Sequence, residues 1–265
     1  MISLLHQIPS EAKIRKVVRR LRFGKNLFCP RCHSRKVYVS EDRYRCAQCR
    51  LPFTLFSGTW LEGMKLSLRT WWCLLWCWTQ AVPVLQTQKL CHVNEKTVRL
   101  WFQAFRLQVP EIQPILQGTV QMDEAYFRSL SLLMAKQVGS RNIVHQTLPK
   151  SSVDRRDAAQ FLFQNIQPRS RLQTDGGAIY QGIQHWWPVT HRRDIHKRFE
   201  FGLTSEIEGM FGNLRAFIRR MYHHSTAQHL PEYVSEFCVR FSSPEIFASP
   251  LAYLTKTLSA VPTAT

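Results

Sequence analysis

The feature that most constrains the fold of this chain is a pair of Cys-x-x-Cys turns, Cys29 with Cys32 and Cys46 with Cys49. Two such turns can present four thiolates to one metal ion at tetrahedral angles, which is the usual ligand set of a structural Zn²⁺ site. The stretch between the two pairs is long enough for a β hairpin, and four cysteines in two matched pairs rarely arise by chance. The sequence therefore predicts a zinc ribbon over residues 27–56, a module too small to bury a core and dependent on the ion for folding.

Other interpretations of the cysteines are weaker. The stretch from Cys29 to His33 matches the c-type haem attachment pattern, but haem attachment requires export and would leave the second cysteine pair without a role. A redox Cys-x-x-Cys turn would need a βαβ context, which this region lacks. We interpret the remaining cysteines, which lie among Trp, Leu and Phe, as small buried apolar residues: Cys73, Cys77, Cys91 and Cys238.

The chain is strongly basic. It contains 36 Lys and Arg against 18 Asp and Glu, a net charge of +18, and thirteen of the basic residues lie in the first fifty positions. A field of this sign attracts polyanions, so we expect nucleic acid as the partner. The ribbon would present six basic side chains to phosphates: Arg31, Arg35, Lys36, Arg43, Arg45 and Arg50.

The sequence contains no pattern of export or membrane insertion. The N-terminus lacks a long apolar stretch with a cleavage site, and no segment reaches the length of a membrane span. We therefore expect no disulfide framework, no membrane partner and a cytoplasmic location together with the nucleic acid.

Helical patterns flank the predicted ribbon. Residues 1–26 form a basic amphipathic pattern, and residues 57–114 are predicted to be helical with a break at Pro83. A short helix, a turn and a second helix follow the break, and Asn94 is a favourable N-cap for the second helix. This order is typical of a helix-turn-helix, although a plain helical hairpin is at least as compatible with the pattern alone. We expect the following residues on the exposed face of the second helix: Lys96, Thr97 and Arg99. We expect these in its core: Val98, Trp101 and Phe105.

The second half of the chain has a different character. Residues 115–230 contain strand patterns followed by helix patterns, which predicts a mixed α/β domain. GTVQMDEAYF is expected to be a strand with alternating faces, RLQTDGG a strand running into a glycine turn, and residues 204–222 a strong helix. Residues 231–265 are expected to form a C-terminal helix and a loosely ordered tail.

Three acids in this domain stand out by position: Asp123 within a strand, Asp175 at the end of another strand, and Glu208 in the first turns of a helix. Cleavage of a phosphodiester requires an activated oxygen nucleophile and neutralisation of charge on the leaving oxygen, and two Mg²⁺ ions held by carboxylates can supply both. Arg215 lies two helical turns beyond Glu208 on the same face, so it could hold a DNA phosphate beside the metal site. Arg219 and Arg220 extend this basic stripe.

Each acid also has a structural interpretation. Asp123 could be a surface acid, and the adjacent Glu124 is expected to point to the opposite face of the strand, so that only one of the two can serve a site. Asp175 precedes two glycines and could form a turn. Ser205 and Glu208 fit a capping box, in which the glutamate only fixes the start of the helix. Taken together with the basic charge and the ribbon, the three acids favour a catalytic role.

The chain resembles the bacterial zinc-ribbon DDE transposases of insertion-sequence family 1595, which are related to the Merlin transposases. The resemblance is carried by CPRC and CAQC, FSGTW, GTVQMDEAYF, QTDGGAIY and TSEIEGMFGNLRAFIRRMYHH, in that order. It implies an RNase-H-like catalytic domain with Asp123, Asp175 and Glu208 as ligands of Mg²⁺ or Mn²⁺, and Arg215 in the place of the family's basic residue. The chain departs from the family's usual HTN-x-IE stretch, since Leu203 replaces the histidine and Ser205 the asparagine.

A transposase of this type would bind the terminal inverted repeats of its own element and target DNA, cleave the element ends and join them to the target. Such enzymes work as multimers on paired ends, so we expect a homo-oligomer on DNA. Two alternatives remain: a zinc-ribbon and helix-turn-helix regulator or inactive transposase relic that binds DNA without catalysis, and a metal-dependent nuclease without strand transfer.

Overall fold

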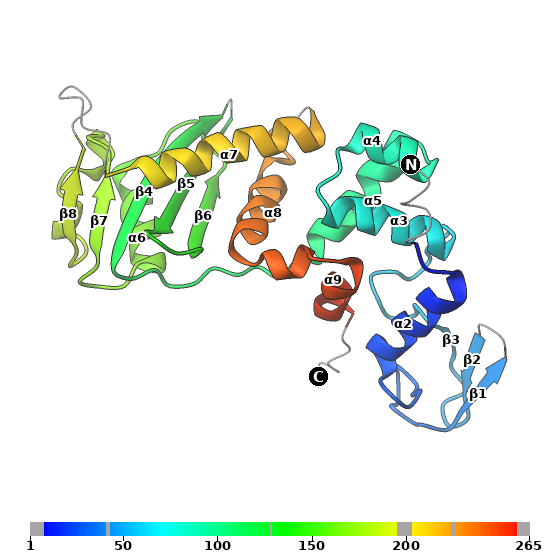
Figure 1. The fold of residues 1–265 in the computed structure, drawn as a ribbon. Coiled ribbons are helices and arrows are strands. Elements are labelled where there is room, and N and C mark those ends of the chain that lie inside the picture. Colours follow the sequence, from blue (N-terminus) through cyan, green and yellow to red (C-terminus); the bar gives the residue numbers. More distant parts are fainter. Residues whose placement is uncertain (1–7, 41–42, 128, 195–202, 224–225, 259–265) are drawn as a thin grey trace. The chain divides into compact units, whose positions relative to one another are not determined.

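The computed structural model describes five stretches of the chain (Figure 1), which are residues 8–40, 43–127, 129–194, 203–223 and 226–258. The contacts divide the chain into two compact units. The first comprises Met1–Pro110 with Glu245–Thr265, and the second comprises Glu111–Pro244. No helix within the described stretches is long and apolar enough to cross a membrane.

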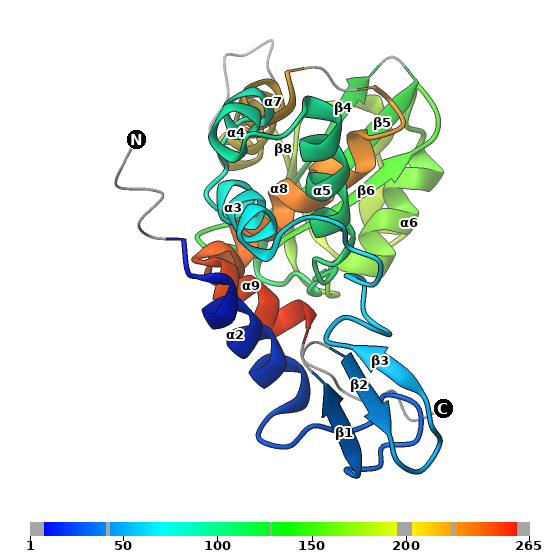
Figure 2. The same ribbon diagram turned by 90° about the vertical axis from the view of Figure 1, so that its right-hand side faces the viewer.

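The first unit contains the predicted ribbon, a three-stranded antiparallel sheet in the order β1-β2-β3. Its strands are β1 (Val37–Ser40), β2 (Arg43–Cys46) and β3 (Pro52–Thr54), and they lie side by side in Figure 2. The register pairs Val37 with Cys46 and Tyr44 with Phe53. Its small core includes the rings of Tyr44 and Phe53, whose centroids lie 5.3 Å apart.

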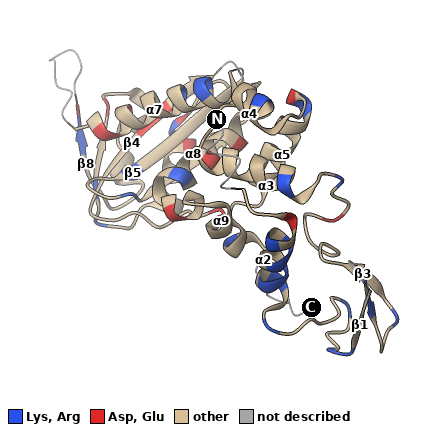
Figure 3. Cartoon of the chain, turned by 45° about the vertical axis from the view of Figure 1, so that its right-hand side comes forward, with Lys and Arg blue, Asp and Glu red and all other residues tan. Residues whose placement is uncertain are grey.

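Helix α2 (Glu11–Phe23) precedes the ribbon and carries Lys and Arg along its length (Figure 3). Ser10 caps its N-terminus, since the Ser10 side chain accepts a hydrogen bond from the Lys13 amide. Near the other end Arg22 is buried, and its guanidinium donates to the carbonyl oxygens of Leu55, at 2.5 Å, and Ser57. One arginine of this basic helix therefore fastens it to the segment after β3. The first seven residues of the predicted 1–26 helix lie outside the described residues.

Three helices follow in the first unit: α3 (Leu68–Thr79), α4 (Val84–Cys91) and α5 (Glu95–Leu107). The predicted N-cap is confirmed, because Asn94 Oδ1 accepts a hydrogen bond from the Thr97 amide at 2.7 Å. Val98 and Phe105 are buried as predicted, whereas Trp101 is only half-buried and Phe102 takes the expected core position. Residues 98, 102 and 105 are spaced four and three apart, so they form one continuous stripe on the helix.

The C-terminal part of the chain contributes to both units. Helix α8 (Leu230–Ser242) belongs to the second unit, whereas α9 (Pro250–Thr257) belongs to the first. Tyr253 of α9 is fully buried, its ring centroid lies 5.2 Å from that of Trp78, and its hydroxyl donates to the Phe105 carbonyl at 2.8 Å. The segment predicted as a single C-terminal module is therefore divided between two cores. Residues 259–265 of the predicted tail lie outside the described residues.

The second unit is built on a five-stranded sheet in the order β6-β5-β4-β7-β8. Strand β4 pairs antiparallel with β5, β5 pairs antiparallel with β6, and β7 and β8 are parallel to β4. This order and these directions are those of an RNase-H-like sheet, so the predicted α/β fold class is confirmed. The strands are β4 (Thr119–Phe127), β5 (Leu130–Gln137), β6 (Ile143–Leu148), β7 (Arg171–Thr174) and β8 (Thr190–Arg193).

Helices cover both faces of this sheet. Val120 and Met122 face a core that includes Phe161 of α6 (Arg155–Asn165). Gln121 lies between them and faces the other way, where its side-chain oxygen accepts a hydrogen bond from the Ile207 amide of α7 (Ser205–Tyr222) at 3.0 Å. The alternation of β4 thus directs its odd-numbered residues towards α7, which crosses the sheet in Figure 1. Short 3-10 helices complete the fold: η1 (Ala178–Tyr180), η2 (Ile183–His185) and η4 (Pro244–Phe247).

Candidate active site

Asp123 and Asp175 meet where β4 and β7 stop pairing. The last pair of the parallel ladder is Gln121 with Gln173, and each aspartate lies two residues further along its own strand direction. Parallel strands carry equivalent positions to the same edge, so a separation of fifty-two residues in the sequence becomes a contact in space. Oxygen atoms of Asp123, Glu124 and Asp175 all lie within 4.8 Å of one another.

Glu124 is an unexpected member of this cluster. Alternation along β4 led us to expect only one of Asp123 and Glu124 at the site, but oxygen atoms of both lie in the cluster although their side chains leave the strand on opposite faces. Past Gln121 the β7 side of β4 pairs with no strand among the described residues, so the longer Glu124 side chain can reach this edge. Glu124 is held there by the hydroxyls of Tyr180 and Tyr126, which both donate to its carboxylate. The sequence offered no sign of where the strand pairing ends.

Asp175 acts as a turn former and as a member of the cluster. Its Oδ1 accepts a hydrogen bond from the Gly177 amide at 2.9 Å, which fixes the carboxylate against the turn. A Cβ atom on Gly177 would lie 2.8 Å from the same oxygen, so the absence of a side chain there leaves room for the carboxylate. The turn therefore orients Asp175 rather than competing with a role in the cluster.

Glu208 lies on α7, outside the cluster of three. The predicted capping box with Ser205 is not formed, because the N-cap of α7 is Thr204. Instead the Thr204 hydroxyl donates to Glu208 Oε1 at 2.8 Å, so one hydroxyl orients this carboxylate. Glu208 is exposed and is close enough for its charge to act on Asp123. The structure thus brings three acids together and places the fourth beside them.

Asp194 is a buried acid that the sequence analysis missed. It follows β8, and its Oδ2 accepts hydrogen bonds from the Leu203 amide at 2.7 Å and from the Thr204 hydroxyl at 3.4 Å. Thr204 is thereby shared between Asp194 and Glu208. Asp194 acts through this threonine to fix the start of α7, and only its place directly after a short strand pattern could have drawn attention to it.

Two acids of the cluster, Asp123 and Glu124, have raised pKa values. Burial, together with the charges of Glu124, Asp175 and Glu208, raises the pKa of Asp123 to about 7. Burial and the charge of Asp175 also raise the pKa of Glu124 above its ordinary value. Like charges held this closely favour a bound proton or a bound cation. Carboxylate oxygens are the ligands that Mg²⁺ prefers, so the donor set fits a divalent cation of that kind.

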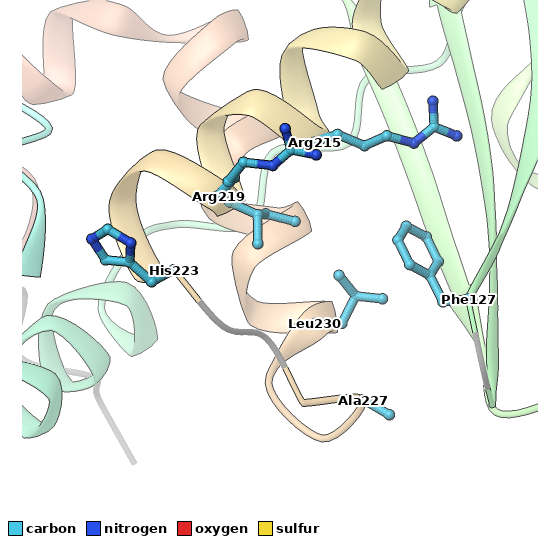
Figure 4. Close-up of a pocket in the computed structure, with 7 residues that line it drawn as sticks. Phe127, Arg215, Arg219, His223, Ala227 and Leu230 are labelled. Carbon is cyan, nitrogen blue, oxygen red and sulfur yellow. The ribbon is translucent and has the colours of Figure 1, made fainter.

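Arg215 lines a pocket at the far end of α7. The pocket has a volume of about 290 Å³, and Figure 4 shows Arg215, Arg219 and His223 along the helix with Phe127 and Leu230 across from them. Arg215 and Arg219 are both exposed, as expected for a basic stripe along this face. A pocket with two guanidinium groups beside apolar walls suits a phosphate attached to an apolar or aromatic group.

The four ribbon cysteines also converge. Their sulfur atoms all lie within 4.8 Å of one another, with 3.5 Å between Cys29 and Cys49 and 3.5 Å between Cys32 and Cys46. The Cys49 amide donates to the Cys46 sulfur, and this bond is the main cause that lowers the pKa of Cys46 to about 6. Low thiol pKa values favour the thiolate form that binds metal. The His33 ring stacks on Phe28, with ring centroids 5.9 Å apart.

Comparisons with known proteins agree with this architecture. Residues 9–51 match the transposase zinc-ribbon domain family, and residues 130–242 match the ISXO2-like transposase domain family. The second match contains Asp175, Glu208 and Arg215 and begins after β4, so Asp123 lies outside it. A protein of the transposable element ISH50 from Halobacterium salinarum, itself described as uncharacterized, is 26% identical over 126 residues. The match covers 45% of this chain and 43% of that relative, so the chain spans less than half of the relative's length.

Two solved structures share a distant likeness. The catalytic core domain of BIV integrase is 14% identical with a TM-score of 0.33, and the match covers 47% of this chain and 82% of the integrase chain. A chain from the intasome of simian T-cell lymphotropic virus is also 14% identical, with a TM-score of 0.34. That match covers 59% of this chain and 67% of the intasome chain.

Proposed function

Because the chain belongs to the zinc-ribbon transposases of insertion-sequence family 1595, we propose that it cleaves the ends of its own element and joins them to target DNA. The observation that carries this proposal is the meeting of Asp123 and Asp175 at the ends of two parallel strands, with Glu208 beside them on α7. A protein that only binds DNA has no need of such a cluster, in which burial and the neighbouring carboxylates raise the pKa of Asp123.

Asp123 and Asp175 would hold divalent cations, Mg²⁺ or Mn²⁺, with Glu208 as the third ligand. Glu124 is a further candidate, because its carboxylate lies in the same cluster. Bound cations would activate the attacking oxygen and neutralise charge on the leaving oxygen of a phosphodiester. The chain's own residues then have positioning roles: Thr204 orients Glu208, the Gly177 amide orients Asp175, and the tyrosines hold Glu124.

The reaction would comprise two phosphoryl transfers at one site. Water first hydrolyses a phosphodiester at the element end and frees a 3′-hydroxyl. This hydroxyl then attacks a phosphodiester of the target, forming one new bond and breaking one old bond, so that no outside energy source is needed. Arg215, on the same helix as Glu208, would hold a DNA phosphate in this reaction.

The front of the chain would supply recognition of the terminal inverted repeats. Cys29, Cys32, Cys46 and Cys49 would hold a structural Zn²⁺ that fixes the ribbon. Helix α5 would act as the recognition helix of a helix-turn-helix, since Lys96 is exposed and Asn94 sets the start of the helix. Joining two element ends to one target requires at least two active sites, so we propose a homo-oligomer on DNA.

Incubation of the protein with DNA that carries its own element ends tests the proposal directly. We expect nicked products that require Mg²⁺ or Mn²⁺, and joined products when precleaved ends and target DNA are supplied. Cleavage without joining would instead identify a metal-dependent nuclease. Sequence-specific binding of the ends without either product would identify the regulator or inactive relic.

We expect the double variant Arg215→Ala, Arg219→Ala to bind DNA more weakly whatever its sequence. Each phosphate contact adds about one counterion to the salt dependence, so the slope of log K against log salt should fall by about 2. Fluorescence anisotropy across a salt series measures this slope. The control is Arg171→Ala, an exposed arginine at the opposite end of β7 from Asp175. Equal slopes for the double variant and the wild type would exclude the two arginines from phosphate binding.

We expect binding of Mn²⁺ at the acid cluster to strengthen as the pH rises towards 7. Below the raised pKa of Asp123, about 7, the cation must displace a proton, so the apparent affinity should rise about tenfold for each pH unit and then level off. Calorimetry in buffers of different ionisation enthalpy counts the released protons. An affinity that does not change between about pH 5.5 and 8 would contradict a role for Asp123 in cation binding.

A further inference from the structure

Three of the four cysteines outside the ribbon meet at one point in the first unit. Cys73 and Cys77 lie one turn apart on the same face of α3, and Cys91 is the last residue of α4. The sulfur of Cys91 lies 3.1 Å from that of Cys73 and 3.9 Å from that of Cys77, and all three sulfurs lie within 4.8 Å of one another. The ribbon sulfurs, at 3.5 Å, have a similar spacing.

Burial alone does not explain this convergence. Cys238 is also buried, as the sequence predicted for all four, yet it belongs to no sulfur cluster among the described residues. Small apolar residues at these positions would need only to fill space, whereas these three side chains direct their sulfurs at a common centre. Sulfurs about 3.8 Å apart are what a tetrahedral zinc site with 2.3 Å bonds requires.

The cluster is open on one side. Cys73 and Cys91 line a pocket of about 310 Å³ together with Arg69 and His92. His92 follows Cys91 directly and adopts a left-handed conformation, with φ of 53°, at the C-cap of α4. His92 is exposed and lines the same pocket as Cys73 and Cys91. A pocket with an imidazole and a guanidinium at its rim can supply a fourth ligand and offset the negative charge of three thiolates.

We propose that Cys73, Cys77 and Cys91 bind a second structural Zn²⁺, with the fourth position supplied from the pocket where His92 lies. The ion would link α3 to α4, and α4 is the first helix of the proposed helix-turn-helix. Three thiolates favour a thiophilic ion over Mg²⁺ or Ca²⁺, and no disulfide joins α3 to α4 among the described residues. The site is independent of the ribbon and of the acid cluster.

Zinc content tests this proposal on the full chain. We expect two zinc ions per wild-type chain when the protein is purified under reducing conditions, measured by plasma mass spectrometry and native mass spectrometry. The double variant Cys73→Ser, Cys91→Ser should contain one ion, and Cys238→Ser, which changes a buried cysteine outside the cluster, should contain two. Replacement of zinc by Co²⁺ gives a second measurement, because seven cobalt–thiolate bonds in the wild type compare with four in the double variant. The near-ultraviolet thiolate absorption of the wild type should therefore exceed that of the double variant by about three quarters.

The wild-type measurement keeps the test independent of whether the variants fold. One zinc per wild-type chain, removed by Cys46→Ser, would overturn the proposal. A wild-type mass two daltons below that of the reduced chain, with one zinc, would also overturn it, since the close pair Cys73 and Cys91 would then form a disulfide. A double variant that still holds two ions would show that the second ion binds elsewhere.

Discussion

Asp123→Asn should abolish metal-dependent DNA cleavage and, at the same time, stabilise the protein in the absence of metal. Loss of a carboxylate that holds the catalytic cations should lower the cleavage rate by roughly 10³-fold or more, about 4 kcal/mol in the activation barrier. The stability gain follows from the pKa of Asp123, which is raised to about 7 in the folded protein from an ordinary value of 3.8. A raised carboxyl pKa means that the folded state loses stability as the pH rises through about 7.

Asparagine cannot ionise, so the variant avoids this loss. At pH 8 in the presence of a chelator we expect a gain on the order of 2–4 kcal/mol in the free energy of unfolding, which disappears below about pH 4. Cleavage assays and chemical denaturation at both pH values measure the two effects. The control is Glu245→Gln, an exposed acid of the first unit, which should change neither. Cleavage at the wild-type rate in Asp123→Asn would remove this residue from the site.

Cys46→Ser should unfold the ribbon and weaken binding to the element ends by a larger factor than any single arginine variant. The Cys46 sulfur lies 3.5 Å from that of Cys32 and accepts the Cys49 amide, so it is central to the four-thiolate set. Structural zinc contributes about 10–16 kcal/mol of apparent binding free energy to small domains, far more than a ribbon of this size can replace. The ribbon's fold therefore depends on the complete set of ligands.

Limited proteolysis measures this effect, since we expect new cuts within residues 27–56 while the second unit remains resistant. Cys238→Ser serves as the control, because it removes a buried thiol of the second unit. Binding to the element ends at fixed salt gives the second readout. A Cys46→Ser protein that keeps its ribbon protected and binds the ends normally would contradict a structural zinc.

The sequence predicted the parts of this fold whose signals are local. The paired cysteines, the Asn94 cap and the presence of strand patterns followed by helix patterns in the second unit all follow from spacing and residue type within short windows, whereas the RNase-H-like arrangement was implied by the family resemblance. The sequence could not reveal Glu124 as a neighbour of Asp123, because that depends on where a strand from fifty residues later stops pairing. The position of Asp194 is equally non-local, since it acts on the start of α7.

The ends of helices and their buried faces also depend on contacts with distant parts of the sequence. Ser205 and Glu208 satisfy the capping-box pattern, but Thr204 occupies the N-cap position, and its hydroxyl contacts the Asp194 and Glu208 carboxylates in place of a backbone amide. The pattern of α5 correctly predicted Val98 and Phe105 as core residues. It also predicted Trp101, whereas the structure buries the adjacent Phe102. The choice between adjacent aromatic residues is decided by the neighbouring helices, which a periodicity does not specify.

The placement of Tyr253 in the aromatic core of the first unit determines which unit can complete its fold first as the chain is synthesised. The ribosome releases Trp78 and Phe105 long before the last helix that the structure describes, so their core is completed only after α9 has emerged. The second unit, whose residues are contiguous in the sequence, can fold earlier than the first. A product truncated before residue 250 would contain every proposed catalytic acid in its second unit, but its first unit would lack the buried Tyr253, so we expect that unit to be less stable.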